Sequence, residues 1–141
     1  MSIDVKYRTT ATTTGGREGH TRSADGVLDL KLSRPKEFGG PGGDGTNPEQ
    51  LFAAGYSACF LGALKLAAGK RKVDVPAEAS ISATVGIGAN GQGGFGLAVQ
   101  LSANLPGIER ATAEQLVAEA HQICPYSNAI HGNVDVDLTV A

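Results

Sequence analysis

Four stretches of the chain alternate between apolar and polar residues with a period of two, and a fifth does so more weakly. Within residues 95–105, for example, Phe95, Leu97 and Val99 all fall on one side of an extended chain. This period is typical of β-strands with one covered face and one solvated face, as in antiparallel sheets. The pattern predicts strands at residues 28–32, 77–87, 95–105 and 134–140, and a weaker strand at residues 4–12.

The longest apolar segment, residues 48–71, is predicted to be an α-helix. Asn47 is a good N-cap, and Pro48 suits the first helical position. Apolar residues cover nearly the whole circumference of this helix, so we expect it to be buried. A membrane span is the rival interpretation, but Ser57, Lys65 and two glycines weaken it, and the predicted strands supply a sheet to cover the helix. We therefore expect no membrane insertion.

A second helix is predicted from Thr112, whose spacing to Gln115 resembles a capping box, up to the interruption at Pro125. Strands, helix, strands, helix and strand then follow one another along the chain. This order favours an α+β fold with an antiparallel sheet and the two main helices packed on one face. A length of 141 residues predicts one domain, residues 1–141.

Charge and short motifs exclude several classes of protein. The formal net charge is −2 without a long block of one sign, so we expect no nucleic-acid binding. Residues 86–91 match the glycine spacing of a dinucleotide-binding loop, but an alternating strand follows where that motif requires a helix, so a hairpin loop is the better interpretation.

The N-terminus lacks an apolar signal region, which predicts a cytoplasmic protein. There, two cysteines are more often buried thiols, metal ligands or redox-active groups than a permanent disulfide.

Cys59 lies inside the apolar helix, where the plainest interpretation is a small buried hydrophobe. A reactive cysteine must be a thiolate, and at the ordinary pKa of about 8.5 only about 3% of a thiol is ionised at pH 7. Burial would raise the pKa further, and the helix dipole fades after the first turn. A reactive Cys59 therefore needs a cation from elsewhere, and an arginine would also stabilise a departing alkoxide.

Arg17 is the candidate cation, because glycines on both sides of it in "TTTGGREGH" would let its loop fold inward. The competing interpretation is an ordinary solvated arginine. A buried arginine needs an anion when no substrate is bound, and Glu49 at the start of the apolar helix could supply it. Glu49 could equally serve only to complement the N-terminus of that helix.

Cys124 lies where the second helix meets Pro125. If Cys59 were oxidised to a sulfenic acid, Cys124 could condense with it, provided that their Cα atoms lie about 5.5 Å apart. His121 and Cys124 also form an H-x-x-C pair that would suit a metal, although a structural zinc site normally needs four ligands. The C-x-x-C spacing of general disulfide oxidoreductases is absent.

The sequence resembles the OsmC/Ohr family of osmotically inducible and organic hydroperoxide resistance proteins. The segments that carry the resemblance are "YRTTATTTGGREG", "GGDGTNPEQLFAAGYSACFLGAL" and "CPYSNAIHGN", and the first and third favour the organic hydroperoxide resistance branch. The resemblance implies a thiol peroxidase without metal or bound organic cofactor. Such an enzyme reduces organic and lipid hydroperoxides to alcohols in preference to hydrogen peroxide. The reductant would be a dithiol, typically a lipoylated protein.

The resemblance also assigns residue roles. Cys59 would be the peroxidatic cysteine, Cys124 the resolving one, and Arg17 and Glu49 the polar network that activates Cys59. The implied fold is an intertwined α+β homodimer with its sites at the subunit interface. The helical spacing of Phe52 and Tyr56 relative to Cys59 would let both line a pocket for an alkyl group, with ordinary core packing as the alternative.

Spacing along the apolar helix supports a site shared between two chains. Glu49 and Cys59 are ten residues apart, which is about 15 Å along a helix axis. One arginine would struggle to reach both unless the helix breaks between them. Two copies packed antiparallel about an axis near Ala54 would bring Glu49 of one chain level with Cys59 of the other. The main alternative function is a non-enzymatic redox-sensing or small-molecule-binding protein that uses the same cysteine pair.

Overall fold

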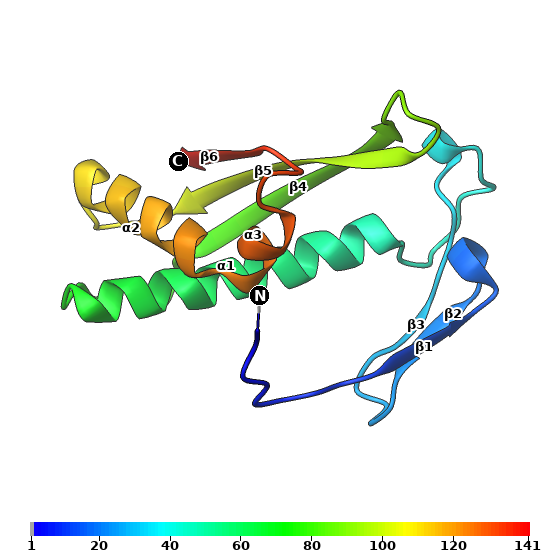
Figure 1. Ribbon diagram of the computed structural model, residues 1–141, viewed down its shortest axis with the longest axis horizontal. Coiled ribbons are helices and arrows are strands. Elements are labelled where there is room, and N and C mark those ends of the chain that lie inside the picture. Colours follow the sequence, from blue (N-terminus) through cyan, green and yellow to red (C-terminus); the bar gives the residue numbers. More distant parts are fainter. Residues whose placement is uncertain (1) are drawn as a thin grey trace. The chain divides into compact units, whose positions relative to one another are not determined.

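A computed structural model describes residues 2–141 of the chain. The chain forms two compact units, which divide between Pro48 and Glu49. Figure 1 traces the elements of both units in chain order, from blue to red.

The first unit contains a three-stranded antiparallel sheet in the order β1-β2-β3. Two short 3-10 helices, η1 and η2, follow β1 and β3 respectively. The predicted strand at residues 28–32 is confirmed as β3, whereas the one at residues 4–12 begins later, as β1. The elements are β1 (Ala11–Thr14), η1 (Gly16–Glu18), β2 (His20–Ser23), β3 (Asp29–Lys31) and η2 (Lys36–Phe38).

Strand β2 was not predicted, because its inward-facing residues are polar. Thr21 and Ser23 are its buried side chains. The Thr13 hydroxyl donates to the Thr21 hydroxyl at 2.9 Å, and the Ser23 hydroxyl donates to Asp25 at 2.6 Å. Because these groups satisfy one another, the strand buries polar residues without leaving unpaired hydroxyls, and a search for apolar alternation misses it.

The second unit packs helices against one face of a sheet in the order β4-β5-β6. Val99, Leu101 and Ala103 alternate along β5, so they share one face, and they join a single core cluster with the buried residues of α1 and α2. The α+β prediction with two main helices on one face is therefore confirmed. The elements are α1 (Pro48–Lys70), β4 (Ser80–Ala89), β5 (Phe95–Asn104), α2 (Arg110–Ile123), α3 (Pro125–Ile130) and β6 (Val136–Val140).

Two details of the predicted sheet were wrong. The strands form two separate sheets rather than one, and β6 pairs parallel to β5 rather than antiparallel. Parallel pairing needs a long crossover, and residues 105–135, which contain α2 and α3, provide one. The hairpin prediction is confirmed, since β4 and β5 are antiparallel neighbours. At their turn, the Asn90 side chain accepts hydrogen bonds from the backbone N–H groups of Gln92 and Gly94.

The predicted start of the second helix also needs correction. Helix α2 begins at Arg110, with Glu109 as its N-cap and no side-chain capping bond, so Thr112 lies inside the helix. Its buried residues recur at helical spacing and face the core. These residues are Ala113, Leu116, Val117 and Ala120.

Helix α1 is buried on one face only, rather than all round as the sequence suggested. Tyr56, Phe60 and Leu64 are 0% exposed, and full burial of such side chains is worth about 1.5–3 kcal/mol each. On the opposite side, Ala54, Ala58, Gly62 and Leu66 are exposed and form what we call the open face of α1. By length and hydropathy α1 could cross a membrane, but the core helices of globular proteins meet the same criterion.

Candidate functional site

The two cysteines, 65 residues apart in sequence, lie side by side in the second unit. The Cys124 thiol donates to the Cys59 sulfur with an Sγ–Sγ distance of 3.5 Å, and both thiols are free. Cys59 is half-buried on α1, whereas Cys124 is 0% exposed. A disulfide bond is about 2 Å long, so a small side-chain movement would join the two sulfurs. Only the partly exposed thiol, Cys59, is open to a molecule arriving from solvent.

Pro125 explains the position of Cys124. The residue before a proline is driven out of the helical region, and Cys124 has φ −61° and ψ 122°. Helix α2 therefore stops at Ile123, and Pro125 begins the short helix α3. The Cys124 backbone N–H still donates to the carbonyl of Ala120 at 2.8 Å, so the break is satisfied by a hydrogen bond. The break fixes the buried thiol against α1.

The immediate surroundings of Cys59 keep it protonated. Burial raises the pKa of the Cys59 thiol above its ordinary value, and the neighbouring Cys124 raises it further. A hydrogen bond from the Tyr126 backbone N–H acts in the opposite direction, since it favours the thiolate. The second unit alone thus leaves Cys59 a weak nucleophile at neutral pH, which agrees with the argument that a cation must come from elsewhere.

Three aromatic rings pack against one another in the same part of the second unit as the thiol pair. Phe52 packs edge-on against Tyr56 at a centroid distance of 5.8 Å, and Tyr126 lies 5.9 Å from Phe52 and 5.7 Å from Tyr56. Tyr56 is fully buried, whereas Phe52 is half-buried and Tyr126 is 38% exposed. The outer wall near Cys59 is therefore formed by Phe52 and Tyr126, and Tyr56 lies behind them. The sequence interpretation did not single out Tyr126, because it lies in a different helix.

Gly55 makes this arrangement of rings possible. A Cβ atom at position 55 would lie 2.7 Å from the Tyr126 hydroxyl oxygen and 3.1 Å from Cε2. The first distance is shorter than a Cβ atom tolerates and the second is tight, so the Tyr126 ring packs on the bare backbone of α1 one turn before Cys59.

Behind the rings, three polar side chains form a hydrogen-bonded chain that the sequence interpretation also missed. The hydroxyls of Tyr56 and Ser127 are 2.6 Å apart, and the Ser127 hydroxyl lies 2.9 Å from Nδ1 of His121. Burial lowers the pKa of His121, and the charge of His131 lowers it further. The only signal in the sequence was the polar composition of "HQICPYS", which does not reveal a contact with α1.

Arg17 lies in the first unit, in η1. Gly15 and Gly16 have φ of 73° and 59°, in the left-handed region that favours glycine, so they make the tight turn before Arg17 possible. After it, a Cβ at Gly19 would lie 1.7 Å from the Thr14 carbonyl oxygen. The glycines therefore determine the shape of this loop, whereas its inward folding stays a prediction.

The Arg17 guanidinium stacks on a ring in the first unit. Its Cζ atom lies 5.2 Å from the centroid of Phe38, and Arg34 lies 5.7 Å from the same ring. Both distances are typical of cation–π contacts.

Glu49 and Cys59 lie on the same unbroken helix. Helix α1 runs without interruption from Pro48 to Lys70, with Glu49 in its first turn. A break in the helix would have let one arginine reach both side chains easily, but the helix has no such break. The structure brings together Cys59, Cys124, Phe52 and Tyr56 in the second unit, and the approach of Arg17 to Cys59 stays a prediction.

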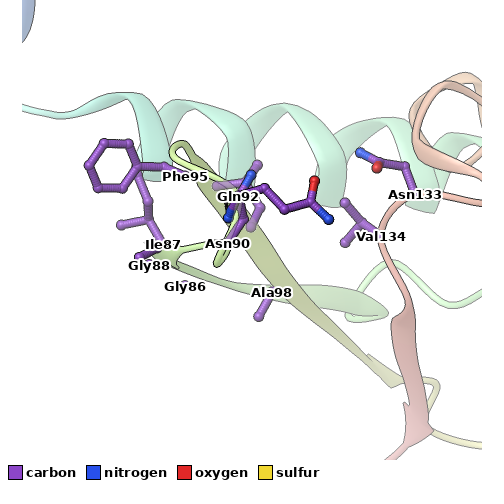
Figure 2. Close-up of a pocket in the computed structure, with 12 residues that line it drawn as sticks. Gly86, Ile87, Gly88, Asn90, Gln92, Phe95, Ala98, Asn133 and Val134 are labelled. Carbon is purple, nitrogen blue, oxygen red and sulfur yellow. Dashed lines mark hydrogen bonds between the residues drawn. The ribbon is translucent and has the colours of Figure 1, made fainter.

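Two alternatives to a thiol site are a metal site at the cysteines and a binding site in a cavity elsewhere in the second unit. Within residues 2–141, no cluster of three or more His, Cys, Asp or Glu side chains could hold a metal ion, and Nδ1 of His121 is engaged by Ser127. A cavity of about 650 Å³ lies at the turn of the β4–β5 hairpin, next to Asn133 and Val134. Figure 2 shows that glycine, amide and apolar residues line it. Since no titratable side chain lines it, we place the chemistry at the thiols rather than in this cavity.

Comparisons with known proteins agree with the fold. A family model described as OsmC-like protein matches residues 40–139. The organic hydroperoxide resistance protein of Xanthomonas axonopodis pv. citri is 58% identical over 137 residues, which cover 97% of this chain and 96% of that protein.

Solved structures of organic hydroperoxide resistance proteins share the fold of this chain. The organic hydroperoxide resistance protein of Elizabethkingia anophelis, with crystallant-derived thiocyanate bound, has a TM-score of 0.92 and 50% identity, covering 99% of both chains. OhrB of Bacillus subtilis has a TM-score of 0.87 and 42% identity, covering 96% of this chain and 98% of that one. The chain therefore belongs to the OsmC-like protein family, in its organic hydroperoxide resistance branch.

Proposed function

We propose that this protein acts in organic hydroperoxide resistance as a thiol-dependent peroxidase, which reduces organic and lipid hydroperoxides to alcohols. The observation that carries the proposal is the pair of free thiols 3.5 Å apart, one half-exposed and one buried. Two relatives named organic hydroperoxide resistance protein, each 58% identical to this chain, support the same conclusion.

The proposed reaction runs in three balanced steps. The Cys59 thiolate attacks the terminal oxygen of the hydroperoxide, the O–O bond breaks, and the alkoxide takes a proton to leave as the alcohol. Cys59 is then a sulfenic acid. Cys124 attacks the Cys59 sulfur, the S–S bond forms, the S–O bond breaks and water leaves. A dithiol finally reduces the disulfide by exchange and becomes a disulfide itself.

We assign the activation of Cys59 to Arg17. A cation at the thiol would lower the raised pKa of Cys59 and stabilise the alkoxide as it departs. Glu49 would hold the guanidinium in place when no substrate is bound. The aromatic wall of Phe52 and Tyr126, with Tyr56 behind it, suits an alkyl hydroperoxide better than hydrogen peroxide, because it offers apolar contact area.

We propose that the active form is a homodimer whose sites are each built from both chains. The open face of α1 supports this, since Ala54, Ala58 and Gly62 are small enough for close approach of a second helix. With Glu49 about 15 Å along the axis from Cys59, antiparallel packing of two α1 helices would bring each glutamate near the cysteine of the other chain.

The reductant in this proposal is a dithiol, carried by a lipoylated protein. Cys124 is buried and Cys59 is half-buried, so a slender lipoyl arm would reach the disulfide between them more easily than a folded thiol protein. We place the reaction in the cytoplasm, because a cycle that starts from two reduced thiols needs a compartment that keeps thiols reduced.

Steady-state kinetics test the proposed function. The protein is assayed with cumene hydroperoxide, tert-butyl hydroperoxide and hydrogen peroxide, with dihydrolipoamide as the reductant. We expect multiple turnovers and a higher kcat/KM for the two organic peroxides. A single oxidation without turnover under excess dihydrolipoamide would contradict the peroxidase and indicate a redox sensor with the same cysteine pair.

A further inference from the structure

The polar groups in the hydrogen-bonded chain from Tyr56 to His121 have no part in the reaction as described so far. Tyr56 is 0% exposed and Ser127 is 2% exposed, so the first two members are shielded from water. Their hydroxyls are 2.6 Å apart, and Nδ1 of the half-buried His121 lies 2.9 Å from the Ser127 oxygen. Two hydroxyl groups therefore connect the protein core to a side chain that can hold a proton.

The inner end of this chain lies at the thiol pair. Tyr56 lies three residues before Cys59 on α1, and it belongs to the same buried core cluster as Cys124, against which Cys59 packs. Cys124 itself is 0% exposed, so it has no direct contact with solvent through which to lose a proton. A phenylalanine at position 56 would fill the same space without burying a hydroxyl, so packing alone does not require this chain.

We propose that Tyr56, Ser127 and His121 form a proton relay for the disulfide-forming step, an inference that rests on the proposed function. As the Cys124 sulfur attacks the oxidised Cys59, its proton passes to the Tyr56 oxygen, the tyrosine proton to Ser127, and the serine proton to Nδ1 of His121. The S–S bond forms, the S–O bond of the half-buried Cys59 breaks, and the departing hydroxide takes a proton from solvent to leave as water. His121 then returns its proton to solvent, so charge and atoms balance.

His121 and Ser127 are positioning residues in this scheme, since they act on Cys124 through Tyr56. The relay requires a neutral imidazole whose proton is on Nε2, so that Nδ1 accepts from Ser127. Burial lowers the pKa of His121, as does the neighbouring His131. His121 is therefore neutral at pH 7, and the relay is open. It closes when His121 is protonated, at a pH below the ordinary histidine range.

A single-turnover experiment tests the relay. Reduced protein is mixed with one equivalent of cumene hydroperoxide between pH 5 and 8. Peroxide loss reports the first step, and acid quenching with thiol alkylation and mass spectrometry reports disulfide formation. In the wild type we expect the second step to slow as the pH falls through the lowered pKa of His121.

The decisive variant is His121→Gln, which can hydrogen-bond to Ser127 but cannot accept a proton. We expect its peroxide step to be unchanged, its disulfide step to be slower by about 10²-fold at pH 7, and its acid inflection to disappear. Tyr56→Phe should show the same slowing, without a further loss when it is combined with His121→Gln. The matched control is His131→Gln, which should keep the inflection and move it to a higher pH.

The outcomes separate the relay from the proposed function. If the wild type consumes peroxide and forms the disulfide, but His121→Gln does so at the same rate with the same pH profile, the relay is wrong and the peroxidase stands. If His121→Gln is slower but keeps the wild-type inflection, His121 has only a structural role and the relay is again wrong. If the wild type consumes no peroxide, both proposals fail.

Discussion

Replacing Gly55 with alanine sets two effects of known size against each other. The new methyl group would lie 2.7 Å from the Tyr126 hydroxyl oxygen, 3.1 Å from Cε2 and 3.2 Å from Cζ, so the ring must move. Tyr126 would then lose its contacts with Phe52 and Tyr56, which contribute about 0.5–1.5 kcal/mol each. Within a helix, however, alanine is favoured over glycine by about 0.8–1.0 kcal/mol. The free energy of unfolding should therefore fall by about 0–2 kcal/mol.

The assay is urea denaturation followed by far-UV circular dichroism, since the chain has no tryptophan. Protein concentration is held fixed, because assembly would shift the apparent stability. The matched control is Gly69→Ala near the end of the same helix, where a Cβ would meet nothing within 4 Å. It should be stabilised, by up to about 1 kcal/mol.

The Gly55→Ala variant should also react more slowly with peroxide at neutral pH. Movement of Tyr126 would weaken the hydrogen bond from its backbone N–H to the Cys59 sulfur, and that bond favours the thiolate. Equal stabilisation of both alanine variants would refute the reasoning, because it would mean that the Tyr126 ring contributes no contact. A loss above about 4 kcal/mol would refute it as well, since it would exceed what the aromatic contacts are worth.

Three further predictions concern the proposed chemistry. Cys59→Ser should abolish peroxide reduction, whereas Cys124→Ser, without an added thiol, should consume about one equivalent and then stall or overoxidise; peroxide titration checks both, and dithiol-driven turnover by Cys59→Ser would rule out the assignment. Arg17→Ala should fold normally and react about 10²–10³-fold more slowly, with only partial rescue by Arg17→Lys, which lacks the planar fork; stopped-flow rates and a thiol titration of Cys59 decide, and no change in either would contradict the role of Arg17. Refolding Cys59→Ser together with Glu49→Ala should restore one intact site per mixed dimer if sites are shared; mixed dimers without recovered activity would count against the shared site.

The sequence predicted most of the fold where local patterns determine it. The alternation in residues 77–87 and 95–105 identified β4 and β5, because each strand has one face on the core. It missed β2, where Thr21 and Ser23 are buried through hydrogen bonds that only the partner strand reveals. It also assigned the wrong direction to β6, since alternation is the same in parallel and antiparallel strands.

The sequence allowed candidate residues to be named, but not the contacts that these residues make with one another. The end of the helix before Pro125 could be predicted from the sequence, and the structure shows its effect on the backbone of Cys124. Contacts that join α1 to residues 121–127 could not be predicted, because they depend on how two helices distant in sequence pack together. Examples are the hydrogen bonds of Ser127 with Tyr56 and His121, and the packing of the Tyr126 ring on Gly55.

The central claim is that peroxide converts two neighbouring free thiols into a Cys59–Cys124 disulfide. The most direct test treats the reduced protein with one equivalent of cumene hydroperoxide and maps its peptides by mass spectrometry without reduction. The account predicts one equivalent of cumyl alcohol and a peptide pair joined through Cys59 and Cys124, which dihydrolipoamide separates again. Peroxide consumption that leaves both cysteines as free thiols, or that oxidises Cys124 while Cys59 stays reduced, would contradict it.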